Sequence, residues 1–249
     1  MSVSVVIPAR WKSERLPGKI LADIAGKPVL WHTWDRTCQM QLAREVVIAV
    51  DDKDVFNEVR TWGAKVVMTD EKCQSGTERA FSILNQLKGD MILIVQGDEC
   101  FVDWRLLDNM VKAWQENETD IITPVYRFKN WSDVEDSGNV KVVVNENGRA
   151  LYFSRSPIPH VRGVNPLDWL EKHPFWWHIG VYGYRREVLA HYAKLPRSSL
   201  EEIEKLEQLR FLEAGFHIQV METDYHELSV DTLKDLEKAR KIMLKDLVK

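Results

Sequence analysis

The first part of the chain alternates short apolar runs with longer segments of helical periodicity. The runs are strand-sized and rich in valine and isoleucine, and they are apolar on both faces, which is typical of strands buried in a parallel sheet. Because helical segments follow these runs, the pattern predicts right-handed βαβ units and an α/β fold with a doubly wound, mostly parallel sheet. The runs lie at residues 3–7, 45–50, 65–68 and 91–95, and the helical segments lie at 28–40, 52–62 and 77–87.

After Asp98 the alternation gives way to hairpin-like pieces. A helix is expected at 104–117 and a strand at 120–127, and two further strands flank a turn at 145–148. We interpret 128–184 as a smaller lobe within a single domain that spans 1–249. The remaining expected elements are helices at 185–194 and 199–214, a strand at 217–222 and a closing helix from 232 onward.

Composition narrows the possible functions. The 249 residues are 45% hydrophobic, which predicts a folded chain. With 34 basic and 38 acidic residues the net charge is −4, so we expect no nucleic-acid partner, although a local pocket for a small anion is compatible. No apolar run is long enough for a bilayer, and no signal-peptide pattern is present, so neither membrane insertion nor export is predicted. The three cysteines are an odd number and widely spaced, which favours a reducing cytoplasm over a disulfide framework or a zinc site.

A basic loop, residues 10–19, follows the first predicted strand. It carries Arg10, Lys12, Arg15 and Lys19, and Gly18 allows close approach of a ligand to the backbone. Because ligands bind at the carboxyl ends of strands in such sheets, the loop predicts a triphosphate site. A solvated basic loop without a ligand is the alternative. The P-loop pattern and the dinucleotide fingerprint are both absent from the sequence.

Three further positions combine a structural and a functional interpretation. Ser75 to Arg79 reads Ser-Gly-Thr-Glu-Arg, which is a favourable helix start in its own right. Asp98 follows the strand at 91–95, where a carboxylate can face a ligand, and Asp231 precedes the last helix. Either aspartate is also a common turn or cap residue.

The opening VVIPARWKSERLPGK resembles that of the CMP-Kdo synthetases, the 3-deoxy-manno-octulosonate cytidylyltransferases. The resemblance continues in order along nearly the whole chain, through LADIAGKPVLWHTWDR, AVDD, SGTER, QGDE, ALYFSRSPIP, HIGVYGYR, LEQLR and VDTLKDLEKAR. It implies a Rossmann-like nucleotidyltransferase fold whose smaller lobe serves sugar binding and dimerisation. One departure is Cys100, which stands where the family usually has proline after QGDE.

The resemblance also implies a role for individual residues. Arg10, Lys19, Asp98 and Asp231 would be catalytic, and the two aspartates would hold Mg²⁺, which needs few protein carboxylates when phosphates and water complete its shell. The residues implied at the nucleotide are Ala9, Arg10, Lys19, Ser75, Arg79 and Gln96. The residues implied at the sugar are Gln96, Arg155, His178, Tyr182, Glu207 and Gln208. Seen alone, His178 among tryptophans is more typical of a core histidine.

The activity that the resemblance implies is the reaction of CTP with a 3-deoxy-ulosonic acid, Kdo or a close relative, to give a CMP-sugar and pyrophosphate for lipopolysaccharide or another surface glycan. Two alternatives stay open. One is the same reaction on an 8-amino-Kdo or a nonulosonic acid, and the other is a non-catalytic nucleotide-binding protein on this fold. A homodimer is expected from the family.

Overall fold

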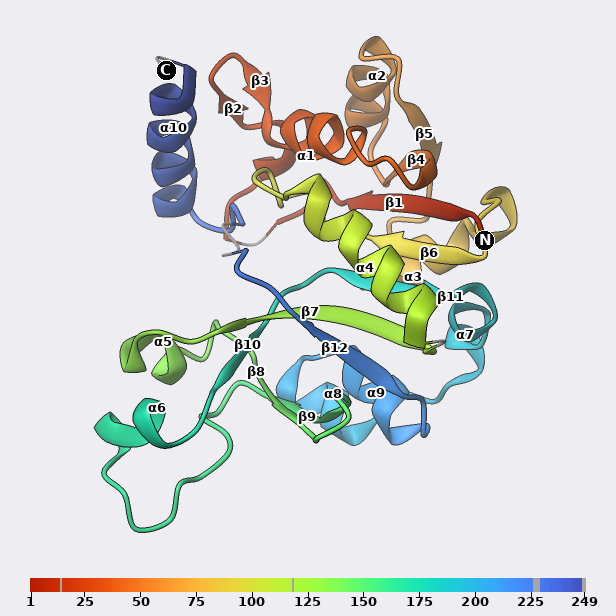
Figure 1. The fold of residues 1–249 in the computed structure, drawn as a ribbon. Helices are drawn as coiled ribbons and strands as arrows, with labels where there is room; N and C mark the ends of the chain where they lie inside the picture. Colours follow the sequence, from red (N-terminus) through yellow and green to blue (C-terminus); the bar gives the residue numbers. More distant parts are fainter. Residues whose placement is uncertain (14, 118, 226–228, 248–249) are drawn as a thin grey trace. The chain divides into compact units, whose positions relative to one another are not determined.

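The computed structural model describes residues 1–13, 15–117, 119–225 and 229–247. The chain forms two compact units, one made of 1–111 with 227–249 and the other of 112–226 (Figure 1). The lobe expected at 128–184 falls entirely within the second unit.

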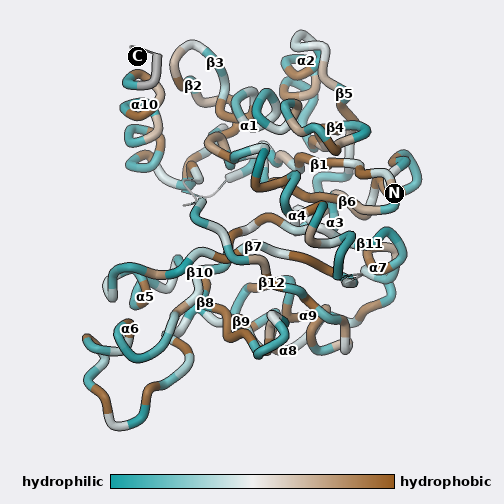
Figure 2. Tube along the Cα trace, viewed as in Figure 1, coloured by the Kyte–Doolittle hydropathy of each residue, from teal (hydrophilic) through white to brown (hydrophobic). Residues whose placement is uncertain are grey.

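The first unit is built on a parallel sheet in the order β5-β4-β1-β6. Its central strand β1 (Val3–Ala9) is buried along its whole length, and Figure 2 shows its trace as largely hydrophobic. The predicted βαβ alternation and the predicted α/β fold are therefore confirmed, because the four apolar runs pair in one layer. The other strands are β4 (Ala43–Val50), β5 (Lys65–Met68) and β6 (Met91–Ile94).

Side-chain caps determine where two helices of this unit begin. Asp52 accepts hydrogen bonds from the backbone N–H groups of Asp54 and Val55 at the start of α2, and Ser75 accepts one from Glu78 at the start of α3. The helices are α1 (Val29–Thr37), α2 (Lys53–Thr61), α3 (Gly76–Ser82) and α10 (Leu233–Leu247), with single turns η1 (Lys19–Leu21) and η2 (Leu84–Gln86) and a hairpin of β2 (Asp23–Ile24) and β3 (Lys27–Pro28).

The last helix, α10, closes a small core of its own with the β2 hairpin. Leu236 and Ala239 pack with Ile24, Val230 and the fully buried Cys100. Burial raises the pKa of the Cys100 thiol to about 12, so this cysteine is a neutral core residue. Cys100 therefore serves packing.

The second unit is a mixed sheet centred on β7 (Ile121–Arg127). β10 (Trp176–His178) and β11 (Tyr182–Arg185) both pair antiparallel with β7, and β12 (Ile218–Glu222) pairs parallel with it. β8 (Lys141–Val144) joins β10 and forms the predicted hairpin with β9 (Ala150–Ser154). The helices are α4 (Trp104–Asn117), which leads into this unit, α5 (Trp131–Glu135), α6 (Trp169–Lys172), α7 (Arg186–Ala190), α8 (Ser199–Glu204) and α9 (Gln208–Glu213), with turns η3 (Pro166–Asp168) and η4 (Tyr192–Lys194).

Three expected helices are wrong in extent. The segment 199–214 is two helices rather than one, because Lys205 adopts a left-handed conformation with φ 56° and ends α8. The segment 185–194 forms α7 and the single turn η4, and the segment 77–87 forms α3 and the single turn η2.

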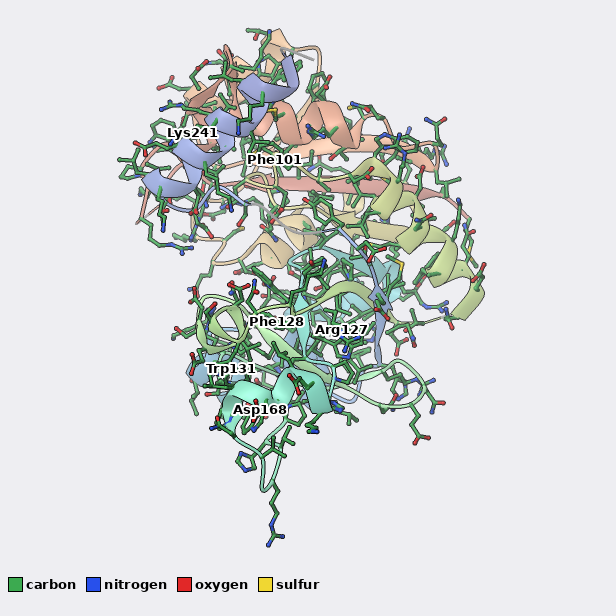
Figure 3. All side chains as sticks on the ribbon, turned by 60° about the vertical axis from the view of Figure 1, so that its left-hand side comes forward. Phe101, Arg127, Phe128, Trp131, Asp168 and Lys241 are labelled. Carbon is green, nitrogen blue, oxygen red and sulfur yellow. The ribbon has the colours of Figure 1, made fainter. Side chains whose placement is uncertain are left out.

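Aromatic packing organises the outer part of the second unit. Trp131 meets the Trp169 ring edge-on at 5.2 Å, and Phe128 stacks on Trp177 at 5.3 Å. Phe128 and Trp131 are labelled in Figure 3 near the short helices of this unit. Trp169 is buried in this aromatic cluster, and Trp131 and Trp177 are partly buried against it. Among the described residues, no helix is both long and apolar enough to cross a bilayer.

Candidate active site

A lysine ammonium lies between two carboxylates in the first unit. Lys19 Nζ donates a hydrogen bond to Asp98 Oδ2 and another, of 2.8 Å, to Asp231 Oδ1. Lys19 starts η1, Asp98 follows β6, and Asp231 precedes α10. The N–H of Val230 donates to the carbonyl oxygen of Asp98 at 3.2 Å, which holds the two acidic segments together.

Lys19 and Asp231 each stabilise the charged form of the other. Burial alone would lower the pKa of Lys19, but the carboxylates of Asp98 and Asp231 outweigh it, and the pKa is raised above the ordinary value. Burial would likewise raise the pKa of Asp231, but Lys19 and Arg15 lower it. Arg15 reaches Asp231 Oδ1 at 2.8 Å. Lys19 and Asp231 are therefore both charged at neutral pH.

The donor set fits a divalent cation that is only partly bound by protein. Two carboxylate oxygens converge on one cationic atom, so the same pair can face a metal ion. In the described part of the chain no three histidine, cysteine, aspartate or glutamate side chains gather as a ready-made cage. A site with two carboxylates suits Mg²⁺, which commonly takes its remaining ligands from phosphates and water.

The basic loop is held at its start and end. Arg10 is exposed directly after Ala9, the last residue of β1. The next N–H, of Trp11, donates to Asp51 Oδ1 at 2.8 Å. Gly18 has φ 68°, and a Cβ there would come within 3.0 Å of the Trp11 ring, so the ring packs over the glycine.

Arg79, predicted at the base or ribose, is engaged with its own chain. Its guanidinium is 3% exposed and donates to Asp51 Oδ2 at 2.9 Å, and it also donates to the Thr69 hydroxyl. Asp51 thus connects Arg79 on α3 to the backbone of Trp11 in the basic loop.

Ser75 and Gly76 lie at the start of α3, and Gln96 approaches Gly76. The Ser75 hydroxyl accepts from the N–H of Glu78 at 3.1 Å, which confirms the predicted cap. A Cβ on Gly76 would lie 2.8 Å from the Gln96 amide, so glycine at this position lets the Gln96 side chain lie against the start of α3.

The residues predicted at the sugar all lie in the second unit, apart from Gln96. Arg155 donates from Nε to the carbonyl of Glu204 at 2.8 Å and from Nη1 to that of Ser137 at 3.0 Å. Glu204 in turn accepts from the N–H of Arg155 at 2.9 Å. The guanidinium therefore ties β9 to the junction of α8 and α9.

Glu207 and Gln208 lie at that junction, where α9 begins. Gln208 is 3% exposed, and its Nε2 is buried without a hydrogen-bond partner among the described residues. Tyr182 and His178 are also buried, and their rings lie 5.2 Å apart. Burial lowers the pKa of His178 to about 3, so its imidazole is neutral at pH 7.

Comparison with known proteins decides the family. The family described as cytidylyltransferase matches residues 4–244. The 3-deoxy-manno-octulosonate cytidylyltransferase of Porphyromonas gingivalis is 39% identical over 242 residues, covering 95% of this chain and 94% of that protein. The chain belongs to the 3-deoxy-manno-octulosonate cytidylyltransferase family. A solved structure of CMP:2-keto-3-deoxy-manno-octonic acid synthetase complexed with CTP matches with a TM-score of 0.92 and 37% identity, over 99% of this chain and 100% of that chain.

A more distant structure, a cytidylyltransferase from Leptospira borgpetersenii, shares the fold with a TM-score of 0.64 at 16% identity, covering 98% of this chain and 87% of that one. As a member of the 3-deoxy-manno-octulosonate cytidylyltransferase family, the chain is a nucleotidyltransferase enzyme. Enzymes of this kind generally use a divalent metal, in keeping with the paired carboxylates.

The structure adds residues to this cytidylyltransferase site that sequence reasoning missed. Asp51 stands within AVDD at the carboxyl end of β4, so its place after a parallel strand was a usable signal. Trp11 carried no such signal, because it is an aromatic residue in a polar loop.

Proposed function

We propose that this cytidylyltransferase joins CTP to 3-deoxy-manno-octulosonate, giving the CMP-sugar and pyrophosphate. The anomeric hydroxyl oxygen forms a bond to the α-phosphorus, the bond from that phosphorus to the bridging oxygen breaks, and pyrophosphate leaves. The hydroxyl proton passes to solvent. The observation that carries the proposal is the convergence of Lys19, Asp98 and Asp231 in a chain of this family.

Arg10 and Lys19 are assigned to the phosphates. Arg10 is exposed after β1 and free to approach an anion, while Lys19 supplies a buried ammonium whose charge is maintained by its raised pKa. Fixed cations placed where negative charge accumulates on pyrophosphate stabilise the transition state more than the ground state.

Asp98 and Asp231 are assigned to Mg²⁺. When bound, the ion would screen the phosphates and increase the acidity of the attacking hydroxyl. Lys19 and Arg15 lower the pKa of Asp231 against the effect of burial, so this aspartate keeps its ionised form without a metal. In this proposal, Asp98 and Asp231 bind the metal when it arrives with a nucleotide.

Ser75, Arg79 and Gln96 are assigned to the nucleoside, with Ala9 at the backbone beside it. The Gln96 side chain lies close to Gly76, which supports a common pocket wall made by the segment after β6 and the start of α3. Arg79 acts in this proposal mainly through Asp51, since its guanidinium is already paired.

Gln96, Arg155, His178, Tyr182, Glu207 and Gln208 are assigned to the sugar acid. The unpartnered Nε2 of Gln208 supports this, because a buried donor without an acceptor costs about 1 to 3 kcal/mol unless a ligand satisfies it. Arg155 contributes by fixing the segment that carries Glu207 and Gln208.

A homodimer and a cytoplasmic location complete the proposal. The dimer is proposed from the membership of the family, and sedimentation velocity tests it. Cys38, Cys73 and Cys100 are free thiols, and CTP is a cytoplasmic substrate, so both features support a reducing compartment.

Pyrophosphate release tests the reaction. The purified enzyme, CTP and Mg²⁺ are combined in turn with Kdo, an 8-amino-Kdo and a nonulosonic acid. The highest kcat/KM is expected with Kdo. A higher value with either of the other acids would change the substrate, and no release with any acid would favour a non-catalytic nucleotide-binding protein.

A further inference from the structure

Thr123 and His178 form a buried polar pair inside the second unit. Thr123 lies in β7 and His178 ends β10, the antiparallel neighbour of β7. The Thr123 hydroxyl oxygen is 3.1 Å from His178 Nε2. Thr123 is fully buried and His178 is 7% exposed, so water does not compete for this contact.

Thr123 has one hydroxyl proton, and the acceptor of that proton determines whether Thr123 or His178 is the donor in this pair. The same oxygen lies 2.8 Å from the carbonyl oxygen of Val181 and 3.2 Å from that of Ile179, and both carbonyls can only accept. The hydroxyl therefore donates to Val181, and its lone pair is left to face the imidazole. A lone pair requires a donor, so His178 carries its proton on Nε2.

The other ring nitrogen, Nδ1, then has an unprotonated lone pair. The pKa of His178, lowered to about 3 by burial, keeps a second proton off the ring at neutral pH. Within the described part of the chain, the imidazole makes no hydrogen bond other than the one to Thr123. The ring is flanked by the aromatic side chains of Phe153 and Tyr182, with centroids 5.1 and 5.2 Å away.

We propose that Thr123 is a positioning residue that fixes His178 as the Nε2–H tautomer, so that Nδ1 accepts a hydrogen bond from a hydroxyl of the sugar. The inference rests on the proposed function, since the sugar is its ligand. A neutral acceptor attracts a hydroxyl and repels a carboxylate, whereas the other tautomer would present an N–H to a carboxylate. His178 is thus a selector of hydroxyl position, and the carboxylate of the sugar is bound by other groups.

The tautomer can be measured without turnover. In the full-length protein with ¹⁵N-labelled histidine, long-range ¹H–¹⁵N spectra distinguish a protonated from an unprotonated ring nitrogen, and a His178→Asn variant assigns the signals. We expect Nε2 protonated and Nδ1 unprotonated at pH 7, and we expect the Nδ1 signal to move when Kdo is added. An Nδ1–H ring in the wild type overturns the proposal.

Two variants at residue 123 test the positioning role. Thr123→Val keeps the shape but removes the acceptor, and we expect a mixture of tautomers and a rise of about tenfold in KM for Kdo with KM for CTP unchanged. Thr123→Ser restores the hydroxyl and should restore both the tautomer and KM. Wild-type spectra and sugar KM in folded Thr123→Val would overturn the proposal.

The readouts separate this inference from the proposed function. Kdo turnover by an enzyme with an Nδ1–H ring would overturn the inference alone. An Nε2–H ring in a protein that neither turns over Kdo nor shifts its Nδ1 signal with Kdo would overturn the proposed function and, with it, the sugar contact.

Discussion

Asp51 Oδ2 accepts a hydrogen bond of 2.9 Å from the guanidinium of Arg79. The side chain of Asp51 is 9% exposed and that of Arg79 is 3% exposed. The other carboxylate oxygen of Asp51 accepts the N–H of Trp11, so a single buried carboxylate connects α3 to the basic loop. Breaking a buried pair by removing one partner is costly because the other charge stays buried.

Replacing Asp51 by alanine should lower the free energy of unfolding by about 3 kcal/mol and raise KM for CTP. Urea unfolding and CTP kinetics measure the two effects. Asp52→Ala is the matched control, because it removes only the α2 cap and should cost about 1 kcal/mol. Equal losses of unfolding free energy in the two variants would contradict the proposal that Asp51 connects α3 to the basic loop.

Asp98→Asn and Asp231→Asn should each reduce kcat by about 100-fold or more and leave the circular dichroism spectrum unchanged. Each loses one of the two carboxylate charges proposed to hold Mg²⁺, so Mn²⁺ affinity measured by electron paramagnetic resonance should fall as well. Asp235→Asn is the control, since Asp235 accepts from Thr232 at the start of α10 and lies outside the pair. Near-normal turnover of either site variant at saturating Mg²⁺ would remove that residue from the metal site.

Arg155→Lys should lower the melting temperature and raise KM for the sugar while KM for CTP stays constant. Lysine keeps the charge but cannot reach the carbonyls of Glu204 and Ser137 together, so the α8–α9 junction loses a support. Arg162→Lys, at an exposed position of the same unit, should change neither quantity. A lower melting temperature with an unchanged sugar KM would limit Arg155 to a structural role.

Glu45 makes the first unit sensitive to acid. Burial would raise its pKa, but hydrogen bonds from Lys65, Ser4 and the N–H of Lys88 lower it from 4.5 to about 2. Since the folded protein holds this proton more weakly than the unfolded chain, the stabilisation is complete above pH 4.5 and is lost as the pH falls to about 2. Glu45→Gln should flatten the stability curve over this range, as followed by urea unfolding at several pH values, and an unchanged slope would argue against this assignment.

Local sequence determines the parallel layer well, because β-branched runs form β1, β4 and β6, and Ser75 and Asp52 mark their helices by side-chain caps. It does not reveal the break at Lys205, since a left-handed lysine carries no residue-type signal and is held by its surroundings. The partners of the candidate site residues are also not predictable from the local sequence. Nothing in the residue types indicates that Arg79 pairs with Asp51 or that Arg155 donates to backbone carbonyls, because these partners are 28 and 49 residues away.

The first unit is interrupted in sequence, since 112–226 separate its two segments. Asp98 precedes the interruption and Asp231 follows it, yet both bind the same ammonium of Lys19. During synthesis, a ribosome-bound chain can therefore contain Lys19 and Asp98 long before their third partner exists. Under the proposed assignment of both aspartates to the metal, a nascent chain that has not yet reached residue 231 would hold only half of this site and could not consume CTP.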